Sequence, residues 1–407
     1  MTPNPSLTKE KSRSVAYYYD YWLVLAVFSL CAIGLLLLAS ASMGVADKFY
    51  RTPLHFLLRQ TVYLTLGVVT ILIVKRISLD TWMKISGYLL VASIFLLILV
   101  LVPGIGKSVN GSIRWIRLGL ISFQISEFAK VASIIYIAGY LSRHLDKVRV
   151  NIKEFIKPIV LFGIIGSLLI LEPDFGAIAV MMVTALGMMY LAGARLSQFA
   201  FLLLFMLVSL GAMAILSPYR VARLTSFLNP WDKPFDSGYQ LVQALIAFGR
   251  GGVFGVGLGN SIQKLFYLPE AHTDFLFAIL AEEFGIFGQL IIICLFVFFI
   301  LRTFYIGYMA AKINNHFAAY LAYGIGLTIG FQAIINIGVN VGLFPTKGLT
   351  LPFMSYGGSS MLFNCVAIAI MFRIYHEVTL QTTFTPKIYF LTTKVAKQYK
   401  SIKPRIP

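Results

Sequence analysis

The sequence predicts an all-α integral membrane protein with about ten transmembrane helices and one large extracytoplasmic loop. The 407 residues are 58% hydrophobic and only 12% charged. Their mean hydropathy of +0.83 lies far outside the range of soluble domains. Apolar runs of about 20 residues, the length that a hydrocarbon core about 30 Å thick requires of a helix, recur along the whole chain.

Ten such runs account for most of the chain. They lie at residues 22–43, 56–74, 82–102, 121–141, 155–171, 175–192, 198–217, 275–301, 317–344 and 358–375. The first follows a basic segment, as in a signal peptide, but about 20 apolar residues exceed the usual signal-peptide core, so we interpret it as an uncleaved span. The chain therefore divides into a tail (1–20), seven spans (21–217), a loop (218–274), three spans (275–376) and a basic tail (377–407).

The distribution of positive charge predicts the orientation. If the N-terminus is inside, the inner segments hold roughly three times as many Lys and Arg residues as the short outer ones, which is the positive-inside pattern. Both termini are then cytoplasmic and the loop 218–274 is outside. The net charge of +18 is thus a topology signal, and we expect no nucleic-acid partner. The basic tail is equally suited to contact anionic headgroups.

Three polar connections are expected on the outer side, at 103–120, 218–274 and 345–356, and would surround any site there. Their cationic candidates are Lys107, Arg114, Arg117 and Lys347. The long loop carries a glycine run at 249–259. Nucleotide-binding glycine motifs need a preceding strand and a following helix in a soluble α/β unit, so this run instead favours a tight turn or re-entrant segment.

The segment 267–275 places several polar groups at the start of the eighth span. Thr273 is expected to cap that helix, with Asp274 in its first turn. A carboxylate there is stabilised by the helix dipole and needs no further role. A functional role is favoured by the setting, because Lys264, Glu270 and His272 cluster beside it at the membrane surface.

The spacing of carboxylates restricts the chemistry. Asp274 and Glu282 are eight residues apart, so on one helix they would lie roughly 12 Å apart along the axis. Two-carboxylate glycosidases need a separation of about 5–9.5 Å, which disfavours this pair. A lone base suffices where the leaving group is a diphosphate, whose charge cations can neutralise.

Ionisable residues inside the predicted spans are costly and indicate function by default. Glu127 and Lys130 have i, i+3 spacing, so they can pair with one another or bind substrate. Glu282 and Glu283 lie in the eighth span. The cysteines Cys31, Cys294 and Cys365 all fall within spans, which argues against a disulfide framework or a metal cluster.

The sequence LPEAHTDF at 268–275 resembles the core motif of the SEDS family (shape, elongation, division and sporulation). Further matches to family motifs lie at 114–116, 124–127, 173–176, 229–231, 238–240, 257–261, 263–265 and 351–360. Segments 268–275 and 345–350 look closer to the division branch than to the elongation branch. Two residues depart from the pattern: Ile125 replaces a usual proline, and Glu172 a frequent glutamine.

The resemblance implies a peptidoglycan glycosyltransferase that polymerises lipid II during septal cell-wall synthesis, in a bacterial inner membrane at the division septum. Asp274 would be the general base, and undecaprenyl diphosphate the leaving group. The substrate-binding residues implied are Arg114, Lys107, Glu127, Lys130, Lys264, Glu270, His272, Thr273, Lys347 and Ser355. Expected partners are a class B penicillin-binding protein transpeptidase and other divisome proteins. A divalent cation such as Mg²⁺ can assist, although the sequence shows no ligand cluster.

Three alternatives remain at this point. A lipid II flippase would use interrupted helices and ionisable residues near the bilayer midplane. An elongation-type polymerase would share the chemistry. A non-catalytic scaffold for the transpeptidase would have no need of Asp274.

Overall fold

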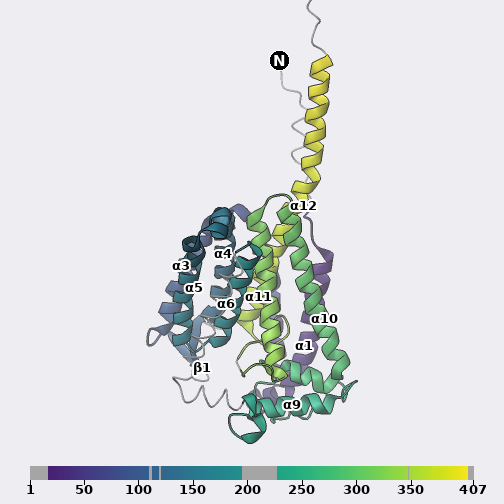
Figure 1. The fold of residues 1–407 in the computed structure, drawn as a ribbon. Coiled ribbons are helices and arrows are strands. Elements are labelled where there is room, and N and C mark those ends of the chain that lie inside the picture. The colour runs from purple at the N-terminus through teal and green to yellow at the C-terminus, as the bar shows by residue number, and fades with distance from the viewer. Residues whose placement is uncertain (1–16, 110–111, 119–120, 195–226, 347, 402–407) are drawn as a thin grey trace, which may run out of the picture.

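The computed structural model describes residues 17–109, 112–118, 121–194, 227–346 and 348–401. Figure 1 shows a helix bundle with strand β1 and helix α9 at one end, here called the sheet end, and the extension of α12 at the other. The helices are α1 (Tyr21–Tyr50), α2 (His55–Val74), α3 (Leu79–Leu101), α4 (Ile125–Val150), α5 (Ile152–Leu171), α6 (Phe175–Leu191), α9 (Tyr239–Gly251), α10 (Leu276–Lys312), α11 (His316–Asn340) and α12 (Gly358–Ser401), with a 3₁₀ turn at Pro230–Asp232.

Nine of the ten predicted spans coincide with helices, and the run at 198–217 lies outside the described residues. Seven helices in the described part of the chain are long and apolar enough to cross a membrane; α6 is shorter, and α4 carries more charge. The prediction of a multi-pass helical membrane protein is confirmed. The largest boundary difference is α12, which continues 26 residues beyond the predicted end at Tyr375.

The connection 103–120 and the start of the fourth span were predicted wrongly. Three strands form an antiparallel sheet here in the order β1 (Gly106–Val109), β2 (Ser112–Leu118), β3 (Ile121–Gln124), and α4 begins only at Ile125. The apolar residues of β2 do not alternate strictly, because Trp115 and Ile116 are adjacent, so the strand lacks the period-2 pattern that marks a half-buried strand in a sequence. The sheet fixes the backbone around Arg114, because Trp115 pairs with both Lys107 and Gln124.

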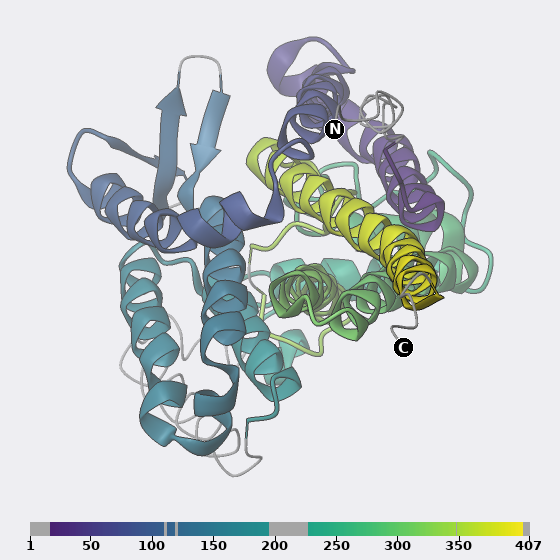
Figure 2. The ribbon, with the colours of Figure 1, turned by 90° about the horizontal axis from the view of Figure 1, so that it is seen from above.

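Small residues allow the helices at the centre of the bundle to pack closely. Helix α11 contacts α4, α6 and α10, and Figure 2 shows these helices side by side in the view along the bundle. A Cβ added at Gly324 of α11 would lie 2.5 Å from Ile134 of α4 and 2.7 Å from the Met188 sulfur of α6. Such small contact residues are typical of membrane helix packing, where van der Waals contact drives association.

Helix α10 is broken near its start by the loop that precedes it. Gly285 has φ +64°, and residues 276–283 are buried, whereas Ile286 is half exposed just past the break. The Gly252 carbonyl accepts a hydrogen bond from the Ile286 N–H (3.0 Å), and a Cβ at Gly255 would lie 2.1 Å from the Glu283 oxygen. The backbone of the glycine run therefore approaches that of α10 closely, as expected. The amphipathic helix α9, which leads into this run, was not predicted.

Candidate active site

The segment before α10 is a turn that holds Asp274 outside the helix. The expected Thr273 cap is wrong: α10 begins at Leu276 without a side-chain cap, and the Thr273 hydroxyl contacts Glu270 instead (2.7 Å to the carboxylate). The Glu270 carbonyl accepts the N–H groups of Thr273 and Phe275, and Glu270 itself has φ +56°. This compact turn, and not the first turn of a helix, presents the Asp274 side chain.

Two amides on one face of α11, Asn336 and Asn340, fix this turn to the bundle. Asn336 and Asn340 donate to the Asp274 backbone oxygen at 2.9 and 3.0 Å, and Asn340 also accepts from the Ala278 N–H. Gln332 lies one turn earlier. These residues were missed in the sequence, although their spacing of four in an apolar span is a detectable signal of polar function inside a membrane. The carboxylate of Asp274 stays available for proton transfer because these bonds reach its backbone.

The connection between α11 and α12 closes over Asp274. A Cβ added at Gly348 would lie 3.2 Å from Asp274 Oδ2, and Asn336 donates to the Leu349 carbonyl at 2.5 Å. The Tyr356 N–H donates to the His272 carbonyl (3.0 Å), so the two segments are directly joined. Ser355, expected to bind substrate, is buried and its hydroxyl accepts from the Leu351 N–H. Lys347 lies outside the described residues.

The sheet brings Arg114 to the same place. Its guanidinium lies 3.2 Å from the carboxylate of Asp174, which also caps α6 by accepting from the Ala177 N–H. Gln124 donates to the same carboxylate at 3.4 Å. Arg114 keeps about a fifth of its side-chain surface exposed, so it can still reach an anion. Lys107 is exposed on β1.

The electrostatics of this cluster suit proton transfer near neutral pH. Burial and the negative charge of Glu270 raise the pKa of Asp274 to about 7, with Asp174 adding to the rise and Arg114 opposing it. A general base is most effective when its pKa lies near the working pH. Burial lowers the pKa of His272, against the effect of Glu270, so the imidazole is neutral at pH 7. His272 packs against the rings of Phe56 and Tyr356.

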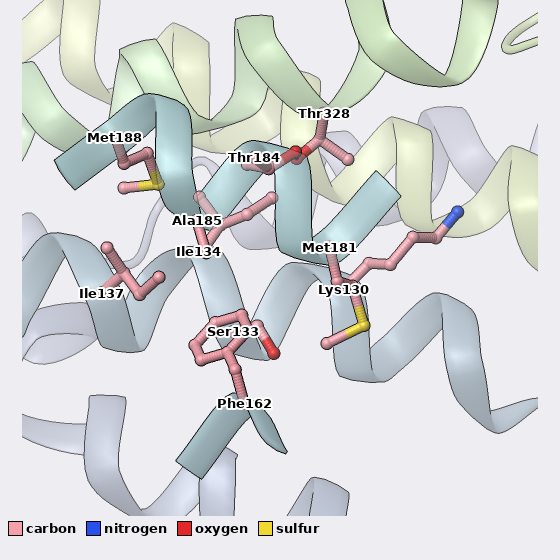
Figure 3. A pocket seen from close by; sticks show the side chains of 10 residues that line it. All are labelled: Lys130, Ser133, Ile134, Ile137, Phe162, Met181, Thr184, Ala185, Met188 and Thr328. Carbon is pink, nitrogen blue, oxygen red and sulfur yellow. The ribbon is translucent and has the colours of Figure 1, made fainter. Parts of the chain in front are cut away.

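Glu127 and Lys130 pair with one another deep in the bundle. The ammonium lies 2.8 Å from the carboxylate and donates to Gln332 at 2.7 Å, while Gln332 donates to the Thr350 carbonyl. Figure 3 shows a small, mainly apolar cavity beside Lys130, with the Lys130 nitrogen pointing away from the other lining residues. The pair therefore links α4 through α11 to the connection that covers Asp274.

A double-mutant cycle tests whether this pair is structural. We expect Lys130→Met to destabilise the protein, because Glu127 loses its buried partner, and Glu127→Gln in the same chain to restore part of the loss. The coupling should be about 0.5–3 kcal/mol in the free energy of unfolding. Additive effects of the two changes, with a raised KM alone, would instead indicate that each residue binds substrate separately.

Lys264 does not join the Asp274 cluster. Its ammonium lies 2.8 Å from Glu283 and 2.7 Å from the Ser40 hydroxyl of α1. Glu282 is fully buried and accepts from Ser261, from the N–H groups of 262 and 263, and from Arg250. These two carboxylates anchor the long loop to α10, so their intramembrane charge has a structural explanation.

No group of three or more His, Cys, Asp and Glu side chains in the described ranges is placed to hold a metal ion. The acidic residues of the cluster are instead engaged locally: Asp174 with Arg114, and Glu270 with Thr273. The described residues therefore offer no ligand set for the Mg²⁺ ion that the resemblance allowed.

The fold and this cluster define a multi-pass membrane protein with one activated carboxylate at the end of a helix bundle. The family model described as "Cell cycle protein", that of FtsW, RodA and SpoVE, matches residues 21–380. The chain belongs to this family, and the resemblance to SEDS proteins is confirmed.

The chain is similar to two curated relatives and to two solved structures. The chain is 54% identical to the "Probable peptidoglycan glycosyltransferase FtsW" of Coxiella burnetii, covering 90% of this chain and 99% of that one. It is 52% identical to the protein so named in Legionella pneumophila, covering 91% and 93%. A chain from a peptidoglycan synthase complex matches with TM-score 0.72 at 26% identity, covering 89% and 99%. The rod shape determining protein RodA of Thermus thermophilus matches with TM-score 0.65 at 26% identity, covering 89% and 97%.

Proposed function

We propose that this chain is a peptidoglycan glycosyltransferase that polymerises lipid II during septal cell-wall synthesis. The observation that carries the proposal is a partly buried carboxylate, Asp274, with a pKa of about 7 and the cation Arg114 close enough to oppose that rise. The chain's family membership and its relatives named FtsW support the same activity and the division role.

In this mechanism Asp274 removes the proton from the acceptor sugar hydroxyl as that oxygen bonds to the donor's anomeric carbon. The bond between that carbon and the diphosphate oxygen breaks with its electron pair, and undecaprenyl diphosphate leaves. A diphosphate needs no proton from a general acid, so one carboxylate suffices. Arg114 would stabilise the negative charge that develops on the leaving diphosphate. Lys107, at the exposed edge of the sheet, would assist it.

The location and partners are part of the proposal. The charge pattern supports cytoplasmic termini, and with that orientation the sheet end would lie on the outer side of the inner membrane, where a lipid-linked substrate is met at the bilayer surface. The septal position is part of the proposed division role. A class B penicillin-binding protein transpeptidase is the expected partner, alongside other divisome proteins. The similar chain from a complex whose description couples polymerization with crosslinking supports such a pairing.

The deciding experiment measures glycan polymer from lipid II, using purified protein with its transpeptidase partner. We expect polymer with the complex and none without this chain. Transfer of lipid II across liposomes without any polymer would favour a flippase. Full polymerisation by the transpeptidase alone would favour a scaffold.

A further inference from the structure

Glu172 is a buried acid that the mechanism above does not use. It lies in the connection between α5 and α6 with 0% of its surface exposed. Neither carboxyl oxygen has a hydrogen-bond partner within the described residues. An ionised carboxylate in such a place loses its hydration without replacement, a cost large enough to favour the neutral acid.

The charged groups that act on Glu172 are Asp174 from its own connection and Arg114 from β2. Asp174 is fixed, because it caps α6 and contacts Arg114 at 3.2 Å. While Glu172 is neutral, the Arg114 guanidinium faces the carboxylate of Asp174, and that of Asp274 where it is ionised, and keeps attraction for another anion. If Glu172 ionises, one further carboxylate competes for Arg114 and adds to the repulsion of an incoming diphosphate.

We propose that Glu172 is a positioning residue whose neutral form keeps Arg114 able to bind the diphosphate of the lipid substrate, and whose ionised form competes with that diphosphate. This inference rests on the proposed function. Glu172 acts through Arg114 and touches no reacting atom.

The pKa of Glu172 places this competition just above neutral pH. Burial and the charge of Asp174 raise its pKa to about 8, against the effect of Arg114. At pH 9 only about a tenth of the protein would then carry neutral Glu172. If only that form binds well, the KM for lipid II rises about tenfold between pH 7 and pH 9.

The test compares wild type with Glu172→Gln, whose amide is neutral at every pH and nearly isosteric with the acid. KM and kcat for lipid II polymerisation are measured from pH 7 to pH 9, with the transpeptidase partner present. We expect the KM of wild type to rise about tenfold and that of Glu172→Gln to stay flat, with the kcat profiles parallel. The exposed Asp236→Asn should keep the wild-type rise.

A binding measurement separates this inference from the proposed function. The affinity for undecaprenyl diphosphate in detergent micelles should fall above pH 8 in wild type, but not in Glu172→Gln or the apolar variant Glu172→Met. Absence of polymer from the wild-type complex would overturn the proposed function alone. An alkaline loss of affinity that persists in either folded variant would overturn the role of Glu172.

Discussion

Replacement of Asp274 by asparagine is expected to abolish glycan polymerisation, lowering kcat by about 10²–10⁴-fold. The amide has nearly the size of the carboxylate but cannot accept the proton of the acceptor hydroxyl. The backbone bonds from Asn336 and Asn340 are retained, so the turn should keep its shape. The measurement is the rate of polymer formation at saturating lipid II, with thermal unfolding as the check on folding.

The pH profile gives this prediction a second readout. If Asp274 is the general base, as proposed, kcat should rise with pH through about 7 as its proton is lost. The matched control is Glu270→Gln, which removes a negative charge that raises the pKa of Asp274. We expect this variant to remain active and its acid limb to shift to lower pH. Normal polymerisation by Asp274→Asn would show that another group is the base.

Much of the fold could be predicted because the bilayer makes hydropathy informative. Apolar runs long enough to span it appear in the sequence as continuous segments, and nine of the ten lie in helices. The convergence of connections 103–120 and 345–356 on Asp274 also followed from topology, since alternate connections share one side of a membrane. The structure brings Arg114 and Gly348 to that carboxylate.

The features that sequence reasoning missed depend on contacts between distant residues. The sheet was missed because its strands are short and two of them have four residues each. The bonds of Asn336 and Asn340 to Asp274 join residues more than 60 positions apart. No local pattern specifies such a pairing. Nor does any local pattern specify the partners of Glu282. Its position in a predicted span indicated function, whereas its contacts with the loop give it a structural role.

Replacement of Glu282 by alanine is expected to detach the long loop from α10 and to destabilise the protein. The carboxylate is fully buried and accepts from Ser261, from the N–H groups of 262 (3.0 Å) and 263 (3.2 Å), and from Arg250 (3.2 Å). Removing it leaves buried donors unpaired and Arg250 without its counter-charge. Each buried donor left unpaired typically costs about 1–3 kcal/mol, whereas Arg250 keeps 37% of its side-chain surface exposed and can be solvated. The measurement is the fall in the unfolding midpoint of the purified protein.

Glu282→Ala should also have reduced activity, although Glu282 lies eight residues beyond Asp274. The buried turns 276–283 connect the two residues rigidly, and the loop supplies the turn that presents Asp274. The matched control is Asp146→Ala, an exposed carboxylate on α4, expected to change the free energy of unfolding by less than about 0.5 kcal/mol. If Glu282→Ala kept wild-type stability but lost activity, Glu282 would act on substrate and the anchoring role would be wrong. If both fall together while Asp146→Ala behaves as wild type, the intramembrane carboxylate acts by holding the catalytic turn in place.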